Sequence, residues 1–275
     1  SVLDSFFVVK SKKGGKVLDS IFKHTENNGE VIITGLQEGL ATTSIVIPET
    51  IDGMPVIEIG PKAFQSTSIT NIKIGENIRG IGEKAFYMCK KLKSVTWNHK
   101  CDVVPAFCFS ECSNLTKFDF SNVKKIGLYA FYKSGLQEVY LTEKIEILDK
   151  GTFSGCSKLQ SVTWHCQCDV IPADCFFGCS NLMQFDFSGV KKIEARAFMG
   201  SGLTSVRLSK KNEVDQNCFA YCNDLKKIEW LSARNIKGDI FKECKNIKEI
   251  FISDKVKNIE VSAFTSSHNA EITFV

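Results

Sequence analysis

The 275-residue chain lacks the features that mark membrane-spanning helices and nucleotide-binding or hydrolytic enzymes. No apolar run approaches the roughly 18 residues that a membrane-spanning helix needs. The start of the chain is not typical of a signal peptide, because its apolar run is short and Asp4 interrupts it. The motifs G-x-G-x-x-G, G-x-x-x-x-G-K-[ST], H-E-x-x-H and G-x-S-x-G do not occur. The sequence therefore predicts no membrane span in this chain and shows no catalytic motif.

Strong charge of one sign is also missing, and histidine is scarce. The formal net charge is +4 and the isoelectric point is about 8.4, well below the basic balance that is typical of nucleic-acid binding. No Ser or Cys is placed with the 4 histidines in a known triad order. The carboxylates Asp119 and Asp186 are one position of a duplicated block, so they do not indicate an acid–base pair. We expect no enzyme, no cofactor and no nucleic-acid partner.

Phenylalanine, by contrast, is abundant at 21 residues, and much of it is periodic. One phenylalanine recurs at intervals of 21 to 23 residues, a spacing that predicts a repeat protein of about ten units. We call these residues the ladder phenylalanines: Phe64, Phe86, Phe109, Phe131, Phe153, Phe176, Phe198, Phe219, Phe241 and Phe264.

Each ladder phenylalanine is followed by a pattern such as L-x-x-V-x-W, seen at Leu92–Trp97, with variants such as "LTKFDF" from Leu115 and "LMQFDF" from Leu182. Apolar and polar residues alternate at the end of this pattern, which predicts a strand with one buried face. One unit cannot bury its apolar residues alone, so stacking of neighbouring units predicts a solenoid. Leu92–Ile126 and Leu159–Ile193 are nearly identical and 67 residues apart, which indicates a duplicated block of three units.

The units "IGEKAFYMCKKLKSVTW" and "IEARAFMGSGLTSVRL" resemble the BspA-like class of leucine-rich repeats. The resemblance implies a right-handed, curved solenoid with a parallel sheet on its concave side and turns or short helical pieces on its convex side. It also implies protein-binding or adhesive roles at the cell surface or in secreted proteins of host-associated bacteria and some protists. The chain departs from commoner leucine-rich repeats at Lys100, where their pattern has Asn.

The repeat predicts the organisation of the whole chain. We expect residues 46–275 to form the repeats and residues 1–45 to form an N-terminal cap, which covers the exposed end of a solenoid. Within the cap, "ENNGE" between apolar stretches predicts the turn of a hairpin.

Most of the 12 cysteines fall on two repeat positions. Six lie three residues after a ladder phenylalanine, where other units have Ser or Thr, and three directly precede one, where other units have Ala. These substitutions predict small, buried side chains. The remaining Cys101, Cys166 and Cys168 are assigned to loops with incidental thiols. The stretch His165–Cys168 could instead bind a soft metal, although its spacing is not C-x-x-C and its upstream copy keeps only His99 and Cys101.

The polar strand residues between the apolar ones are expected to face outward on the concave sheet. This surface mixes charges, hydroxyls and aromatics, which favours a protein ligand over nucleic acid. We expect Tyr140, Arg207 and Phe251 to be its anchors, because Tyr and Arg are favoured in binding hot spots. The acidic residues of the same row are Asp119, Asp186 and Glu229.

Other functions remain open at this point. The surface could bind carbohydrate, with Tyr140, Phe251 and His165 as stacking residues, or the solenoid could be a passive spacer with merely solvated strand residues. Recurrent Lys pairs indicate either a solvated edge or a basic strip for an acidic glycan, and the interspersed acidic residues favour the solvated edge.

Overall fold

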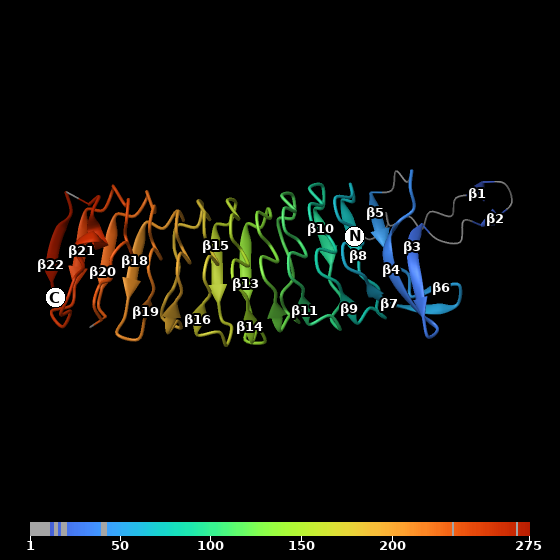
Figure 1. Ribbon diagram of the computed structural model, residues 1–275, viewed down its shortest axis with the longest axis horizontal. Coiled ribbons are helices and arrows are strands. Elements are labelled where there is room, and N and C mark those ends of the chain that lie inside the picture. The colour runs from blue at the N-terminus through green and yellow to red at the C-terminus, as the bar shows by residue number, and fades with distance from the viewer. Residues whose placement is uncertain (1–11, 14–15, 18–20, 40–42, 233, 268) are drawn as a thin grey trace, which may run out of the picture.

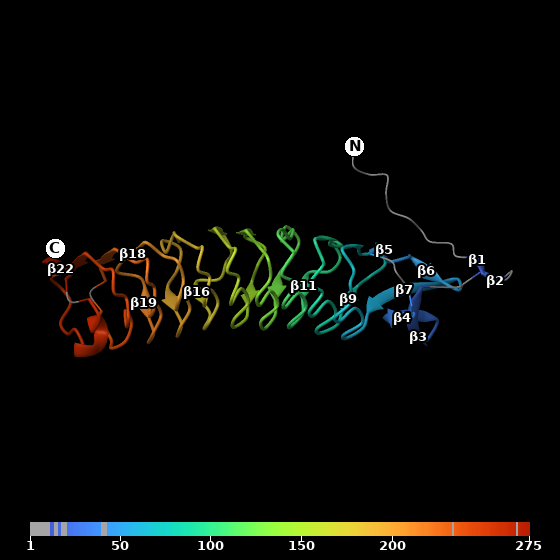
Figure 2. The same ribbon diagram turned by 90° about the horizontal axis from the view of Figure 1, so that it is seen from above.

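The structure, a computed structural model, describes residues 12–13, 16–17, 21–39, 43–232, 234–267 and 269–275. These residues form an elongated solenoid of about 11 turns, which runs from β3 near one end to β22 at the other (Figure 1). The turns stay stacked side by side in the perpendicular view (Figure 2). The solenoid predicted from the spacing of phenylalanine is therefore confirmed. No helix in the described part of the chain is long and apolar enough to cross a membrane.

A parallel sheet runs along one side of the solenoid in three segments, and neighbouring strands within each segment are in register. We call its outward-facing surface the strand face. In the described residues its strands are β5 (Ser44–Val46), β8 (Asn71–Lys73), β10 (Ser94–Thr96), β13 (Glu138–Leu141), β15 (Ser161–Trp164), β18 (Ser205–Leu208), β20 (Lys227–Trp230), β21 (Glu249–Ile252) and β22 (Glu271–Phe274).

The shorter apolar stretch of each unit forms a second set of parallel strands. These strands are β7 (Met54–Ile59), β9 (Gly80–Ile81), β11 (Val103–Val104), β12 (Lys125–Ile126), β14 (Ile147–Leu148), β16 (Val170–Ile171), β17 (Lys192–Ile193) and β19 (Glu213–Val214). Most contribute two residues each, so the main chain turns away from the sheet soon after entering it.

The expectation that the "LTKFDF" and "LMQFDF" segments form strands is wrong, because residues 115–120 and 182–187 lie outside every strand. These two segments separate the three parts of the first sheet. We attribute the interruption to side-chain bulk. Phe118 stands where β10 has Val95, and its ring packs against Trp97 of the preceding turn at 5.2 Å and Phe131 of the following turn at 5.1 Å between centroids. Phe185 packs in the same way against Trp164 and Phe198.

The side of each turn that carries the ladder phenylalanine is built from stacked tight turns. In every unit except the last, the residues two before and two after the ladder position adopt left-handed φ angles, as Lys84 (59°) and Met88 (59°) do around Phe86. Alternate amides then donate to carbonyls of the next turn, such as Phe86 N to Cys108 O at 3.0 Å. We call the surface from two residues before to two residues after each ladder phenylalanine the turn face. The only helical element among the described residues is the 3-10 helix Val261–Phe264.

The ladder phenylalanines form the centre of the core. Successive rings stack with centroids 5.1 to 5.8 Å apart along the whole series. Nine of the ten are fully buried, and Phe264 in the last turn is half-buried. This stack is the main reason why every unit keeps a phenylalanine at this position, since each ring packs on its neighbours.

The nine repeat-position cysteines are buried, as predicted, and all 12 cysteines are free thiols. The six that follow a ladder phenylalanine share one further property. Each donates its thiol to the carbonyl of a ladder phenylalanine in the preceding turn, with Sγ–O distances of 2.9 to 3.2 Å. The position therefore selects a small side chain that can donate a hydrogen bond, which explains why Cys, Ser and Thr exchange there.

The assignment of Cys101 to an incidental loop thiol is wrong, because its side chain lies in the core with 3% exposure. Cys101, Cys168 and Asn212 occupy equivalent positions, and each donates to a main-chain carbonyl of the preceding turn. Asn98, also buried, donates to both Gly75 O (2.7 Å) and Ile78 O (2.9 Å). These side chains connect one turn to the preceding one by hydrogen bonds. Asn98 and Cys101 lie close in sequence to Lys100, the position at which commoner leucine-rich repeats have Asn.

The predicted hairpin near the N-terminus is confirmed by β3 (Phe22–Asn27) and β4 (Glu30–Leu36), which pair antiparallel. Asn28 and Gly29 connect them with φ angles of 52° and 77°, as the tightest hairpin turns require. β4 pairs with β7, which also pairs with β6 (Thr50–Ile51), so the hairpin continues into the solenoid. The expected cap also includes residues 1–11, 14–15, 18–20 and 40–42, which lie outside the described residues. β1 (Lys12–Lys13) pairs with β2 (Lys16–Val17).

Candidate functional site

The strand face brings three of the six predicted site residues into one row. Arg207 in β18, Glu229 in β20 and Phe251 in β21 are register partners on adjacent strands. The Arg207 Nε and the Glu229 Oε2 are 3.2 Å apart. Lys227 joins them, since its Nζ lies 3.0 Å from the other Glu229 oxygen and 4.9 Å from the centroid of the Phe251 ring.

Two hollows of the strand face meet at Arg207. One has a volume of about 360 Å³ and is lined by Arg207 together with Asp186 and Ser209. The other, of about 270 Å³, is lined by Arg207, Lys227, Glu229 and Phe251. Asp186 therefore belongs to the same surface, and we name these five residues the strand-face cluster: Asp186, Arg207, Lys227, Glu229 and Phe251.

The cluster offers charges of both signs beside an aromatic ring. Arg207 keeps 75% of its side chain exposed although it pairs with Glu229, whose side chain is 23% exposed. An exposed ion pair contributes little to stability, so the guanidinium can turn to another acceptor at small cost. Chemically, the arrangement suits a ligand that carries both charged and apolar groups.

Tyr140 and Asp119 lie apart from this cluster. Tyr140, which is 54% exposed on β13, contacts His165 with its hydroxyl 3.2 Å from Nδ1 and with ring centroids 5.5 Å apart. Asp119 lies in one of the interrupted segments, where its Oδ1 accepts a hydrogen bond from the amide of Ser121 at 2.9 Å. The six predicted residues therefore divide between separate parts of the strand face.

The metal alternative for His165–Cys168 gains no support from the geometry, because His165 contacts Tyr140 and the Cys168 thiol points to the carbonyl of Ile145. Within the described ranges, one group of three potential ligands lies close together, with ligand atoms of His24, Glu26 and Asp52 all within 4.8 Å. Both of its acidic residues are exposed, and such groups are common without an ion.

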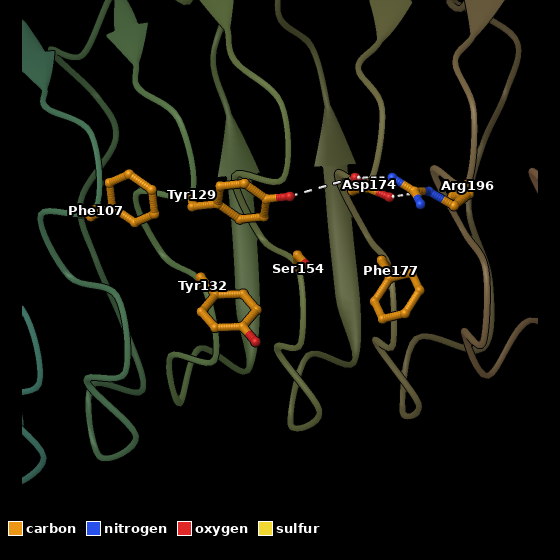
Figure 3. A pocket seen from close by; sticks show the side chains of 7 residues that line it. All are labelled: Phe107, Tyr129, Tyr132, Ser154, Asp174, Phe177 and Arg196. Atoms are coloured by element: carbon orange, nitrogen blue, oxygen red, sulfur yellow. Dashed lines mark hydrogen bonds and ion pairs between the residues drawn. The ribbon is translucent and has the colours of Figure 1, made fainter.

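Sequence reasoning missed a pocket on the turn face, with a volume of about 430 Å³. Its residues form two rows along the solenoid, shown in Figure 3. Phe107, Tyr129, Asp174 and Arg196 each lie two residues before a ladder phenylalanine, and Tyr132, Ser154 and Phe177 each lie directly after one. We call this hollow the turn-face pocket.

The hollow exists because one turn carries small residues at both positions. Gly151 occupies the first row where its neighbours have Tyr129 and Asp174, and Ser154 occupies the second row between Tyr132 and Phe177. A Cβ atom added to Gly151 would collide with the ring of Tyr129, so this ring lies directly over the glycine. On the other side, Phe177 is 39% exposed.

Asp174 provides the polar side of the pocket, with its side chain only 8% exposed. Its carboxylate accepts hydrogen bonds from Arg196 through Nε at 2.8 Å and Nη2 at 2.9 Å, and Lys150 Nζ lies 3.4 Å away. The Tyr129 hydroxyl donates to the same carboxylate at 3.5 Å. Partial burial, together with the charge of this carboxylate, raises the pKa of Tyr129 above its ordinary value.

One signal in the sequence could have revealed the pocket. The residues two before successive ladder phenylalanines read Phe107, Tyr129, Gly151, Asp174 and Arg196, so two aromatics are followed by a gap and an oppositely charged pair. This row becomes visible only when equivalent turn positions of successive units are compared, whereas the alternation within each unit points to the strand residues alone.

Comparisons with known proteins agree with this fold. A sequence profile of the BspA type leucine rich repeat region matches residues 37–160 and 147–271, with six copies. A search of curated proteins finds no match.

Solved structures give similar results. A leucine-rich repeat protein from Bacteroides ovatus is 18% identical with a TM-score of 0.60, over 93% of this chain and 98% of that one. A leucine rich cell surface protein from Faecalibacterium prausnitzii is 22% identical with a TM-score of 0.62, over 94% and 75%. A leucine-rich repeat protein from Eubacterium ventriosum is 14% identical with a TM-score of 0.54, over 93% and 83%. At these identities the likeness shows a shared fold.

Proposed function

Since the chain belongs to the BspA type leucine-rich repeat family, we propose that it is a non-enzymatic binding module that recognises a protein through its strand face. The observation that carries this proposal is the position of Arg207 between two hollows, with Asp186 beside one and Glu229 and Phe251 beside the other. Arginine and aromatic residues at the centre of a hollow surface are typical of protein-binding hot spots.

The charges of the strand-face cluster support a protein ligand. Arg207 and Lys227 face Asp186 and Glu229, so the cluster has no net charge and presents both signs within a few strands. A nucleic-acid surface would need a consistent basic row with aromatics. Such a mixed surface gives orientation and specificity to a protein partner with complementary charges.

We further propose that the module acts at the cell surface or as a secreted protein, in an adhesive role. The Faecalibacterium prausnitzii structure is described as a cell surface protein, and it shares the fold over most of this chain. The placement of the binding surface on regular strands also suits adhesion, since rigid elements hold the contact residues in fixed positions.

A binding screen against immobilised extracellular-matrix proteins and mucin tests this function. The double variant Arg207→Ala/Phe251→Ala should lose saturable binding. A matched control, Arg79→Ala/Tyr221→Ala, removes an arginine with 70% and a tyrosine with 42% exposure elsewhere on the solenoid and should bind like the wild type.

The single variant Tyr140→Ala tests whether the middle segment of the strand face, formed by β13 and β15, belongs to the same site. Unchanged binding by the Arg207→Ala/Phe251→Ala variant, or no saturable binding of the wild-type chain to any protein of the panel, would contradict the proposal.

A further inference from the structure

The turn-face pocket has the properties of a second ligand site, independent of the strand face. We propose that it binds an acidic polysaccharide, with a pyranose ring packed against its aromatic side chains and the carboxylate of the sugar directed to its cationic groups. Its volume of about 430 Å³ lies within the range of small-ligand sites, about 300–1,000 Å³.

The aromatic rings of the pocket do not serve the core. Phe107 and Tyr129 pack on each other at the surface, with centroids 5.7 Å apart and planes 19° apart, and Tyr132 meets Tyr129 edge-on at 5.7 Å. The ladder phenylalanines already fill the interior. Four rings around one open hollow therefore form an apolar surface for a ligand, and tyrosine adds a hydroxyl that can bond to it.

The charges around the pocket favour an anion. Arg196 and Lys150 both contact Asp174, which leaves an excess of one positive charge at this side of the hollow. Lys84 lies over the Phe107 ring at 5.2 Å, and Lys133 lies over the Tyr132 ring at 5.0 Å. Cation–π contacts at a protein surface are weak, so both ammonium groups can turn to an anionic ligand.

Asp174 holds the guanidinium of Arg196 in a fixed orientation beside the pocket. Its buried carboxylate holds the Arg196 guanidinium through two hydrogen bonds while 49% of the Arg196 side chain remains exposed. The remaining N–H groups of Arg196 are thereby held in place for a carboxylate or hydroxyl of the ligand. Preorganised planar donors of this kind are well suited to carboxylates.

The duplicated block provides independent support. The turns "PAFCFSEC" (residues 105–112) and "PADCFFGC" (residues 172–179) are copies that differ at three positions, Phe107/Asp174, Ser110/Phe177 and Glu111/Gly178. Three of these six residues line the pocket: Phe107, Asp174 and Phe177. The copies share the ladder phenylalanine and both cysteines, and they differ at side chains that form the two ends of the hollow.

A polysaccharide fits the layout better than a compact ligand. The pocket residues repeat once per turn in two rows parallel to the long axis of the solenoid (Figure 3). Turns of a parallel stack are about 4.8 Å apart. This is close to the advance of an extended sugar chain per residue, so successive sugars can meet successive turns.

Calorimetry on the full chain tests the proposal. The ligands are hyaluronan oligosaccharides, polygalacturonate and alginate, and neutral dextran is the control. The variant Phe177→Ser introduces the residue that the upstream copy has at this position, Ser110. The variant Tyr132→Ala removes a second ring, so two separate variants test the aromatic surface of the turn-face pocket. Each should weaken binding about tenfold, the upper end of one aromatic contact. Tyr87→Ala changes the equivalent position of another turn, outside the pocket, and should bind like the wild type.

Lys150→Gln should also weaken binding and reduce its dependence on salt, because one cation is lost. The strand-face variant Arg207→Ala/Phe251→Ala should keep polysaccharide affinity, which separates this proposal from the proposed protein-binding function. Equal binding of dextran, wild-type affinity of both ring variants, or no binding of the wild type to any of the three acidic polysaccharides would overturn it.

Discussion

Replacement of Phe153, a ladder phenylalanine near the middle of the solenoid, by alanine should divide the solenoid into two parts that unfold separately. Phe153 is fully buried and stacks on Phe131 at 5.8 Å and on Phe176 at 5.7 Å. In a repeat protein each turn contacts only its neighbours, so cooperativity depends on every interface between turns. The substitution Phe153→Ala weakens two of these interfaces at once.

The expected cost follows from burial and ring contacts. Truncation of a buried phenylalanine to alanine costs about 3–5 kcal/mol, and the loss of two stacked partners places Phe153→Ala at the upper end. Phe264 is the matched control, because it is half-buried and its stacking contact is with Phe241 at 5.3 Å. Phe264→Ala should cost about 1–2 kcal/mol, in proportion to the smaller apolar area that it buries.

Tryptophan fluorescence during urea unfolding can follow the two halves separately. The chain has 3 tryptophans, and Trp97 lies before Phe153 while Trp164 and Trp230 lie after it. Variants that keep only Trp97 or only Trp230 therefore report one half each. With Phe153 intact the two transitions should coincide. In Phe153→Ala they should separate, each with about half the original denaturant slope, since the slope scales with the surface exposed.

Coincident transitions with an unchanged slope in Phe153→Ala would refute this argument, because they would show that the ladder does not carry the coupling between turns. Equal losses of free energy in Phe153→Ala and Phe264→Ala would refute it as well. Phe264→Ala should lower the midpoints of the Trp97 and Trp230 signals together, without separating them.

Three further predictions test local interactions. At pH 8 a thiol reagent should label Cys168 first, because the side-chain hydrogen bond with Cys166 lowers the pKa of Cys168, whereas the same bond raises the pKa of Cys166 and burial raises the pKa of the ten other thiols; mass spectrometry gives the order. Gly202→Ala should cost at least about 2 kcal/mol in urea unfolding, since its Cβ would collide with a carbonyl of the preceding turn, whereas Gly189→Ala meets nothing within 4 Å and should be neutral. Asn98→Ala should cost about 2–4 kcal/mol by the same measurement, because two buried carbonyls lose their donor.

The interior of this protein was predictable because the repeat imposes it. A residue that must stack on its own copy recurs at a fixed interval, so phenylalanine spacing alone located the ladder and the nine buried cysteine positions. The in-register row of Arg207, Glu229 and Phe251 follows from the same periodicity, since equivalent positions of adjacent turns become neighbours.

The interruptions of the sheet were not predictable from the pattern. "LTKFDF" and "LKSVTW" have the same alternation of apolar and polar residues, so the pattern assigns a strand to both. The difference is the volume of Phe118 compared with Val95, and volume matters only once the Trp97 ring of the preceding turn is in place. The same interruptions explain why Tyr140 belongs to a different sheet segment from Arg207.

The turn-face pocket was missed for a related reason. A hollow forms where side chains are smaller than those around them. Gly151 and Ser154 leave such a space only because the adjacent turns carry larger residues at the same positions. The strand pattern of one unit contains no information on the turn residues of its neighbours. The aromatic pair Phe107 and Tyr129, the small Gly151 and the charged pair Asp174 and Arg196 form a row only when equivalent positions of successive units are aligned.

The two copies of the block show where function can vary in such a fold. Their ladder phenylalanines, Phe109 and Phe176, and their buried cysteines are the same, because a change at these positions would disturb both neighbouring turns. Positions that line the surface hollow carry no such constraint, and Asp174 and Phe177 lie there. A substitution on one turn face alters the surface without altering the stack, so a solenoid can acquire a ligand site at one end of a duplicated block while the rest of the block keeps its packing. The strand face obeys the same rule, because Arg207 and Phe251 stand at the position where the duplicated block has Thr96 and Thr163 in strands and Asp119 and Asp186 in the segments between them.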